Sequence, residues 1–329
     1  EYWAFYINAS IIDLGIAIQS LDSKSDVGVG YLLQGQSQVE NHQNSENNYR
    51  DIDVEPISPI FNFTPDLARK MSGITVASSG DMKIAVIGLG AIGSTIVMNL
   101  ARQGIGKWIF VDQDLFLPHN LARHALSGRL VGFPKSEAMQ QSLAFDFQDI
   151  ANLEQFPVNY LSLTSNSADE RYQKLSAANL ILDFSASGAV ERRLSIDNST
   201  PPRLSVYLVP SGKYCIASYE GEGRTVRLDD LNQQLMAKIA AESEFQDVFE
   251  SDENKFQYAG SCRDLSKVIS NDWFLGYAGV VSKFIKNNMG GRIPRLSLFR
   301  WQENPQCLLE NLILIDSVII SESKKWKIH

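Results

Sequence analysis

Residues 83–93 read KIAVIGLGAIG, and this stretch decides the fold of the chain. Its first five residues form an almost continuous apolar run, which is typical of a buried strand. Three glycines follow, Gly88, Gly90 and Gly93, and apolar residues then recur at helical spacing over 91–103. A glycine turn between a strand and a helix lets the backbone approach a phosphate, which the amide groups of the helix N-terminus bind. A turn that serves close packing alone is the alternative.

The elements after this turn continue the alternation of strands and helices. A second strand at 108–111 completes a βαβ unit. The periodicity predicts further strands at 158–161 and 180–183, and helices at 135–147, 168–177 and 189–197. Such alternation predicts a parallel sheet with helices on both faces.

The pattern changes in the C-terminal third of the chain. A hairpin is predicted at 204–209 and 214–219, and later strands at 295–301 and 308–318. Helices at 229–241 and 272–287 flank a charged loop at 242–255. The predicted fold class is therefore α/β: a Rossmann-like doubly wound sheet with mainly parallel strands, antiparallel C-terminal strands and a helical and loop insertion.

The first 55 residues differ from the rest. They are predicted to be the remnant of a preceding domain and a polar linker, because 34–53 is rich in Gln, Asn, Ser and Glu and holds hardly any apolar residue. Residues 56–329 form the main predicted domain, which begins with an arm that contains a short helix at Asp66–Met71 and packs on the strands and helices after it. Since the chain begins at Glu1, we expect it to be part of a longer protein.

Composition excludes several classes of function. The 30 Lys and Arg residues against 38 Asp and Glu give a net charge of −8, which disfavours nucleic acid as a partner. No apolar window is long enough for a membrane span. The three cysteines lie far apart, so we expect no CxxC zinc site, and free thiols in a reducing, cytoplasmic compartment.

Polar residues after the second strand indicate which ligand the glycine turn binds. Asp112 ends that strand, where a carboxylate can accept hydrogen bonds from ribose hydroxyls. This feature alone does not separate NAD, FAD and ATP. Arg123 and Lys135 come later, and two cations suit a triphosphate: Arg123 can bind phosphoryl oxygens in a bidentate manner, while Lys135 can stabilise a leaving pyrophosphate. The alternative places each cation on a solvated face.

The segments GLGAIG, VDQDLFLPHNLARHAL and VGFPKSEA resemble, over roughly residues 80–220, the ThiF-type adenylating domain. This domain is shared by ubiquitin-activating enzymes and by bacterial thiamine and molybdopterin sulfur-carrier adenylyltransferases. The resemblance implies ATP and Mg²⁺ as cofactors and adenylation of the C-terminal carboxylate of a ubiquitin-like or sulfur-carrier-like protein. It implies that Arg123 and Lys135 are catalytic. It assigns the nucleotide to Gly88, Gly90, Gly93, Asp112, Asp114 and Asn120.

The segment from His119 to His124 is most similar to bacterial activating domains fused to conjugating-enzyme-like or JAB-like modules. The resemblance therefore implies a homodimer with a conjugating-enzyme-like module, either fused or separate. The two histidines can contact phosphate or a partner carboxylate, although local backbone groups bind most such side chains.

The sequence departs from the family at the expected magnesium ligand. A second acidic residue would fall at Ala186, and none is present. Asp183 or Asp114 is then expected to contact the metal, with Asp183 as the metal-binding prediction, since magnesium prefers oxygen ligands. A strand-end residue that caps the next helix is the other interpretation of Asp183.

The predicted cysteine-bearing region spans about 229–270. Cys262 lies there in a Gly-Ser-Cys-Arg loop, where Arg263 would lower its pKa, and it is the candidate for a thioester with the activated protein. A structural thiol is the alternative. Cys215 and Cys307 lie in or near strands, where cysteine is usually a small buried hydrophobe.

Two other functions remain open from the sequence. One is an NAD-dependent oxidoreductase that uses the same glycine turn. The other is a catalytically degenerate activating fold that serves as a scaffold, for which the missing acidic residue at Ala186 is the main argument.

Overall fold

The computed structural model describes residues 4–7, 54–57, 62–74, 77–147, 153–165, 168–199, 201–248, 256–258, 265–267, 269–302 and 311–319. The chain divides into two units, Glu1–Asn62 and Phe63–His329. In the first unit, β1 (Ala4–Ile7) pairs with β2 (Val54–Ile57) in antiparallel fashion. The predicted boundary between residues 55 and 56 falls within β2, and the predicted polar linker lies outside the described residues.

The second unit is built on an eight-stranded mixed sheet with the order β12-β11-β8-β7-β6-β3-β4-β5. Its strands are β3 (Lys83–Ile87), β4 (Lys107–Val111), β5 (Glu154–Phe156), β6 (Leu180–Asp183), β7 (Arg203–Leu208), β8 (Tyr214–Tyr219), β11 (Arg295–Gln302) and β12 (Asn311–Ile319). Five neighbouring strands of this sheet are parallel to one another, namely β5, β4, β3, β6 and β7. Strands β8, β11 and β12 extend the sheet beyond β7, and each is antiparallel to its neighbours. This arrangement confirms the predicted fold class.

The strand order contains a topological switch point. From β3 the chain proceeds outward through β4 to β5 and then returns to β6 on the other side of β3. Connections that leave β3 and β6 in opposite directions open a crevice at the carboxyl ends of these strands, where ligands of open α/β sheets bind. The residues after Ile87 and Asp183 are therefore placed at the edge of the sheet where a ligand is expected.

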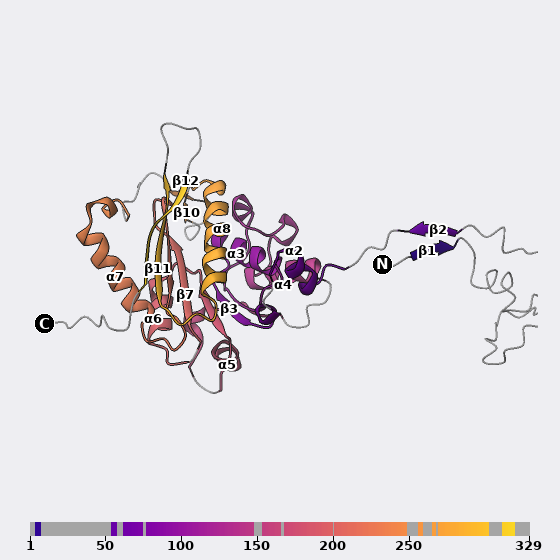
Figure 1. Ribbon diagram of the computed structural model, residues 1–329, viewed down its shortest axis with the longest axis horizontal. Coiled ribbons are helices and arrows are strands. Elements are labelled where there is room, and N and C mark those ends of the chain that lie inside the picture. Colours follow the sequence, from indigo (N-terminus) through magenta and orange to yellow (C-terminus); the bar gives the residue numbers. More distant parts are fainter. Residues whose placement is uncertain are drawn as a thin grey trace, which may run out of the picture. The chain divides into compact units, whose positions relative to one another are not determined.

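Helices cover both faces of the sheet. One core contains α3 (Ala91–Ala101), α4 (Lys135–Asp146) and α8 (Asn271–Asn288), and the other contains α5 (Glu170–Ser176), α6 (Gly188–Ile196) and α7 (Leu228–Ala241). Figure 1 shows α7 and α8 on opposite sides of the sheet. None of the helices in the described ranges has both the length and the apolar character that a bilayer span requires.

Strand β3 shows why its sequence is apolar throughout. Ile84 and Val86 belong to the core under α3, whereas Ala85 and Ile87 belong to the core under α6, and all four are at most 3% exposed. A parallel strand buried on both faces has no solvent side on which to place polar residues.

The predicted arm includes Phe63, whose ring stacks on Phe147 with 5.0 Å between centroids. Helix α2 (Pro65–Met71) comes next, with Thr64 as its N-cap and Pro65 in its first turn. Ala68 of α2 is 1% exposed and belongs to the core of the sheet domain. The predicted short helix and its packing on the sheet domain are confirmed.

The prediction of a strand at 158–161 is wrong. The strand lies earlier, at β5, where Glu154 to Phe156 pair with β4, and Pro157 comes directly after it. Residues 160–162 form a 3-10 turn instead, because the Asn159 side chain accepts a hydrogen bond from the Leu161 amide at 2.8 Å. Tyr160 is buried in this turn rather than in a strand, whereas Leu161 is exposed.

The region predicted at about 229–270 contains α7, a 3-10 turn at Ser243–Phe245 and a two-stranded antiparallel sheet of β9 (Phe256–Tyr258) and β10 (Leu265–Lys267). The predicted charged loop carries apolar anchors at its start, since Phe245 and Val248 are buried in the core beside α7. Cys262 and Cys307 lie outside the described residues.

Candidate active site

The glycine turn after β3 needs two of its three glycines for packing. Gly88 has φ +88°, and a Cβ there would lie 2.7 Å from the Ser185 amide nitrogen. A Cβ on Gly93 would lie 2.4 Å from the Gly88 carbonyl oxygen. Gly90 differs, because a Cβ there would meet open space. The turn is thus packed tightly on its inner side and open at Gly90, as a phosphate-binding turn requires.

Helix α3 starts at the open side of this turn. Gly90 is its N-cap residue, and no side chain within the described part of the chain caps this terminus. The amide groups of the first helical turn have no intrahelical acceptors, and the helix dipole adds a partial positive charge. An anion placed beside Gly90 would therefore meet hydrogen-bond donors and a favourable field.

Asp112 is tied to the glycine turn by backbone amides. Its Oδ2 accepts a hydrogen bond from the Leu89 amide at 2.6 Å, and its Oδ1 accepts one from the Asp114 amide at 2.8 Å. Burial raises the pKa of Asp112, while the nearby Lys135 ammonium and the two amides favour the ionised form. Each carboxylate oxygen retains a second lone pair with which it can accept a further hydrogen bond.

Lys135 begins α4 and reaches the same group. Its Nζ lies 2.9 Å from Asp114 Oδ2, and its backbone amide donates to the Asp114 carbonyl at 2.8 Å. The residue is 8% exposed. The next residue, Ser136, donates from its hydroxyl to the Asp112 carbonyl at 3.3 Å. Asp112, Asp114 and Lys135 are thus brought together at the glycine turn.

Arg123 is held against the start of α8. Its guanidinium lies over the Phe274 ring, 5.3 Å from the centroid, and Nη1 donates to the Ile269 carbonyl at 3.4 Å. Burial lowers the pKa of this guanidinium. Asn120, three residues earlier, accepts a hydrogen bond from the Leu117 amide at 2.9 Å and so closes its own 3-10 turn (Pro118–Ala122).

His124 links the Arg123 segment to the glycine turn. The Leu126 amide donates to Nδ1 at 3.3 Å, so the ring proton is on Nε2, which donates to the Leu89 carbonyl at 2.7 Å. Burial, together with the charge of Lys135, lowers the pKa of His124 to about 4. The neutral ring also packs on Phe116 at 4.7 Å. His124 therefore positions the glycine turn. The sequence alone did not distinguish this role from contact with a phosphate.

Asp183 lies at the carboxyl end of β6 and is 2% exposed. Its Oδ1 accepts from the Ser185 amide at 2.9 Å, and burial raises its pKa to about 6. The cap of α6 is Ser187, whose hydroxyl accepts from the Val190 amide at 3.5 Å, so Asp183 does not cap that helix. In the ranges described, no group of three His, Cys, Asp or Glu side chains is arranged to hold a metal.

Ala186, the position without the expected acidic residue, is exposed and has φ +52°. This left-handed conformation is uncommon outside glycine, asparagine and aspartate. The backbone at Ala186 is therefore already in a conformation that an aspartate tolerates.

Of the three cysteines, the structure describes Cys215, which lies in β8 and is fully buried. Burial raises the pKa of its thiol far above neutrality. An inert thiol of this kind agrees with the interpretation of Cys215 as a core residue.

Together, the parallel strands, the glycine turn and the acidic residue after the second strand define a Rossmann-like α/β domain. The sequence model of the ThiF family matches residues 76–186, so this part of the chain carries a ThiF family domain. The match contains the glycine turn and every predicted nucleotide-contacting residue from Gly88 to Lys135.

Curated relatives match shorter stretches. The ATP-dependent ubiquitin transferase-like protein Cap2 of Vibrio cholerae is 32% identical over 137 residues, which is 39% of this chain and 21% of Cap2. The uncharacterized protein y4oA of Sinorhizobium fredii is 37% identical over 78 residues, 23% of this chain and 13% of that protein. The chain thus matches about a fifth or less of the length of either relative.

Solved structures with a similar arrangement share little sequence. Escherichia coli MccB in complex with ATP is 16% identical, with a TM-score of 0.47, over 76% of this chain and 67% of MccB. PaaA is 16% identical, with a TM-score of 0.48, over 77% of this chain and 76% of PaaA.

Proposed function

We propose that this protein binds ATP at the glycine turn and adenylates the C-terminal carboxylate of a ubiquitin-like or sulfur-carrier-like protein. The observation that carries the proposal is the meeting of Asp112, Asp114 and Lys135 beside a turn that is open at Gly90. The ThiF family match over the same residues supports it. The name of Cap2, an ATP-dependent ubiquitin transferase-like protein, supports a protein substrate.

In the proposed reaction, a carboxylate oxygen of the substrate protein attacks the α-phosphorus of ATP. The bond from this phosphorus to the bridging oxygen of the β-phosphate breaks, pyrophosphate leaves with that electron pair, and an acyl adenylate forms. Amides at the start of α3 hold phosphate oxygens, and Asp112 accepts hydrogen bonds from the ribose. Arg123 stabilises charge on the phosphoryl oxygens, and Lys135 stabilises the leaving pyrophosphate. Asn120 completes the proposed nucleotide contacts.

Mg²⁺ would neutralise part of the triphosphate charge, with Asp183 or Asp114 as its protein ligand. Asp183 is buried and is fully ionised only well above pH 6. The Asp114 side chain is 60% exposed and lies next to Lys135, so a metal can reach it without displacing a core group. The triphosphate and water would supply the remaining oxygen ligands.

Pyrophosphate exchange into ATP tests the adenylation step. We expect Arg123→Ala to lower the exchange rate about 100-fold or more, as the loss of one electrostatic contact to a transition state does. Arg129→Ala, which changes an exposed arginine of a nearby 3-10 turn, is the matched control and should leave the rate unchanged. Exchange that is insensitive to Arg123→Ala would remove the assigned role. Tighter binding of NADH than of ATP would instead favour an oxidoreductase.

A thioester on Cys262 extends the proposal by one step. The thiolate would attack the acyl carbon of the adenylate and release AMP, leaving the substrate protein as a thioester. We expect a reductant-sensitive adduct in the presence of ATP and the substrate protein, lost in Cys262→Ala and retained in Cys215→Ala. An adduct that persists in Cys262→Ala would contradict this step. A homodimer and a conjugating-enzyme-like module belong to the same proposal and rest on the family resemblance.

A second candidate function is an ATP-binding scaffold without turnover. Two observations favour it: Ala186 stands where the family has an acidic residue, and Asp183 is almost completely buried. ATP binding without any pyrophosphate exchange would support the scaffold. In that case Ala186→Asp, at a backbone position that aspartate tolerates, should produce measurable exchange if the missing carboxylate is the cause.

A further inference from the structure

The hairpin between β7 and β8 lies at the same edge of the sheet as the glycine turn. Strand β7 is parallel to β6, which is parallel to β3, so β7 ends with Leu208 at the carboxyl edge. Strand β8 returns in antiparallel fashion, which places Lys213 and Tyr214 at that edge as well. The hairpin turn is therefore in reach of the segments that hold Arg123.

Asp247 ties this hairpin to the α7 face of the sheet. Its carboxylate accepts a hydrogen bond from Lys213 Nζ, and another from the Tyr214 hydroxyl at 2.5 Å. The chain around Asp247 is itself anchored, because Phe245 and Val248 are buried in the core that contains α7. Asp247 thus fixes the hairpin to a buried part of this face.

The other face of the sheet binds the same hairpin. The Tyr277 hydroxyl of α8 donates to the Lys213 carbonyl at 2.5 Å, and the Trp301 amide donates to it at 3.2 Å. Gly212 has φ +74°, and a Cβ there would lie 2.8 Å from Ile269 Cδ1. Since this contact leaves no room for even a methyl group, a shift of the hairpin turn toward Ile269 must also move Ile269.

Ile269 and α8 in turn hold Arg123. The Ile269 carbonyl accepts the hydrogen bond from Arg123 Nη1 at 3.4 Å. Phe274 lies one turn before Tyr277 on α8, and its ring centroid is 5.3 Å from the guanidinium. A continuous series of contacts therefore leads from Asp247 through the hairpin to the guanidinium.

We propose that Asp247 is a positioning residue for the reaction. By fixing the hairpin it sets the positions of Ile269 and α8, and so the orientation of the Arg123 guanidinium toward the phosphates. The inference rests on the proposed adenylation. A small displacement of a group that stabilises a transition state lowers the rate, while the binding of the substrate changes less. Two residues that act through the same contacts show this as non-additive effects of their variants.

A double-mutant cycle in pyrophosphate exchange tests the proposal on the full chain. We expect Asp247→Ala to lower kcat about three- to tenfold, with a smaller change in KM for ATP. In the Arg123→Ala background the same substitution should have no further effect, because its effect passes through Arg123. Equal losses in both backgrounds would overturn the proposal and leave adenylation itself intact. A wild type that shows no exchange would overturn both.

A second variant covers the case in which Asp247→Ala does not fold. Tyr214→Phe removes only the hydroxyl that the carboxylate accepts, and it takes the place of Asp247→Ala in the cycle with the same two outcomes.

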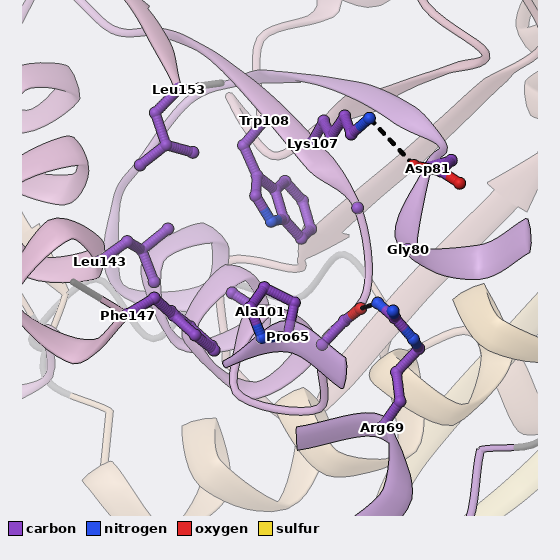
Figure 2. Close-up of a pocket in the computed structure, with 12 residues that line it drawn as sticks. Pro65, Arg69, Gly80, Asp81, Ala101, Lys107, Trp108, Leu143, Phe147 and Leu153 are labelled. Carbon is purple, nitrogen blue, oxygen red and sulfur yellow. Dashed lines mark hydrogen bonds and ion pairs between the residues drawn. The ribbon is translucent and has the colours of Figure 1, made fainter. Parts of the chain in front are cut away.

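Asp81→Ala is the matched control, because it also removes the carboxylate of an ion pair with a lysine. Lys107 Nζ lies 2.9 Å from Asp81 (Figure 2). Lys107 is the first residue of β4, whereas Asp112 comes directly after the last residue of that strand, so this pair lies at the other end of the sheet. The control should keep the wild-type kcat. A loss as large as that in Asp247→Ala would mean that any such pair affects the rate, and would also overturn the proposal.

Discussion

Arg123 depends for its position on a residue that lies 151 positions later in the chain. Phe274 of α8 is 7% exposed, and its ring packs against the Arg123 guanidinium. The Ile269 carbonyl accepts a hydrogen bond from the same guanidinium. A cation over an aromatic face gains about 0.5–2 kcal/mol, and the flat ring also restricts the orientation of the planar group. Phe274 thus acts as a positioning residue for the proposed reaction.

We expect Phe274→Leu to lower kcat for pyrophosphate exchange about tenfold and to change KM for ATP much less. Phe274→Tyr keeps the ring and should restore the rate. The control is Phe284→Leu, at a phenylalanine of the same helix with 8% exposure that packs on Phe299 instead. Equal losses of rate in the two leucine variants would mean that Phe274 contributes only to packing.

The pH dependence of stability provides a test of His124. Its pKa is about 6.5 unfolded and about 4 in the folded protein, so the unfolded state binds more protons between these values. The stabilisation from the neutral ring is complete above pH 6.5 and is lost as pH falls toward 4, by about 3 kcal/mol.

We therefore expect the free energy of unfolding of His124→Gln to depend less on pH than that of the wild type between pH 7 and pH 4.5. Urea unfolding at both pH values measures the difference, and His119→Gln, in the neighbouring 3-10 turn, should retain the wild-type dependence. The same pH slope in wild type and His124→Gln would show that the buried imidazole does not cause it.

At the scale of elements, the glycine turn separates the requirements of folding from those of binding. Gly93→Ala would put a Cβ 2.4 Å from the Gly88 carbonyl and close to Phe184, so the turn must move. Gly90 has φ −72°, which alanine readily adopts, and the methyl group of Gly90→Ala would meet open space. The added methyl group would occupy the side on which a phosphate approaches α3.

We expect Gly93→Ala to lower the free energy of unfolding by about 2–3 kcal/mol, as overpacking does, and Gly90→Ala to change it by less than about 1 kcal/mol. The effect on ATP binding should differ from the effect on stability. We expect Gly90→Ala to remain folded and to bind ATP at least tenfold more weakly. Chemical denaturation and ATP titration of both variants measure these effects. Unchanged ATP affinity in Gly90→Ala would place the phosphates elsewhere.

Long elements with a clear period were predictable from sequence, and the short edge strand was not. The predicted ends of β3, α3, α4 and β6 lie within two residues of the observed ones, because burial on one or both faces imposes their apolar pattern. Strand β5 has three half-buried residues at the sheet edge, and its pairing with β4 leaves no periodic signal in EQF. Periodicity therefore places the strand at the apolar residues that come after Pro157.

The candidate site was predictable to the extent that sequence neighbours define it. The connection from β4 to the start of α4 contains Asp112, Asp114 and Lys135. It starts at the carboxyl edge of the sheet, where the glycine turn after β3 also lies. The topology therefore brings these three residues close to the turn. Other contacts of the site depend on packing between segments that are distant in the sequence. The Leu89 backbone bonds to both Asp112 and His124, and the Phe274 ring lies against Arg123. No local pattern encodes such contacts.

At the scale of the whole molecule, the second unit contains both hydrophobic cores of the sheet domain. Among the residues whose burial the structure describes, the two cores extend from Ala68 to Phe299. The arm is part of this unit through Phe63 on Phe147, the buried Ala68 and the Arg69 hydrogen bond to Gly104. The domain is therefore expected to fold without residues 1–62, but not with its full stability once α2 is also removed.

Two truncated chains test this expectation. Residues 63–329 should unfold within about 2–4 °C of the full chain, since a change of 1 kcal/mol shifts the Tm of a domain of this size by no more than that. Residues 75–329 lack the Phe63 stacking, the burial of Ala68 and the Arg69 hydrogen bond, which together contribute about 3 kcal/mol. We expect their Tm to be lower by about 5–10 °C in thermal unfolding. Equal Tm values for the two truncated chains would show that α2 does not stabilise the sheet domain.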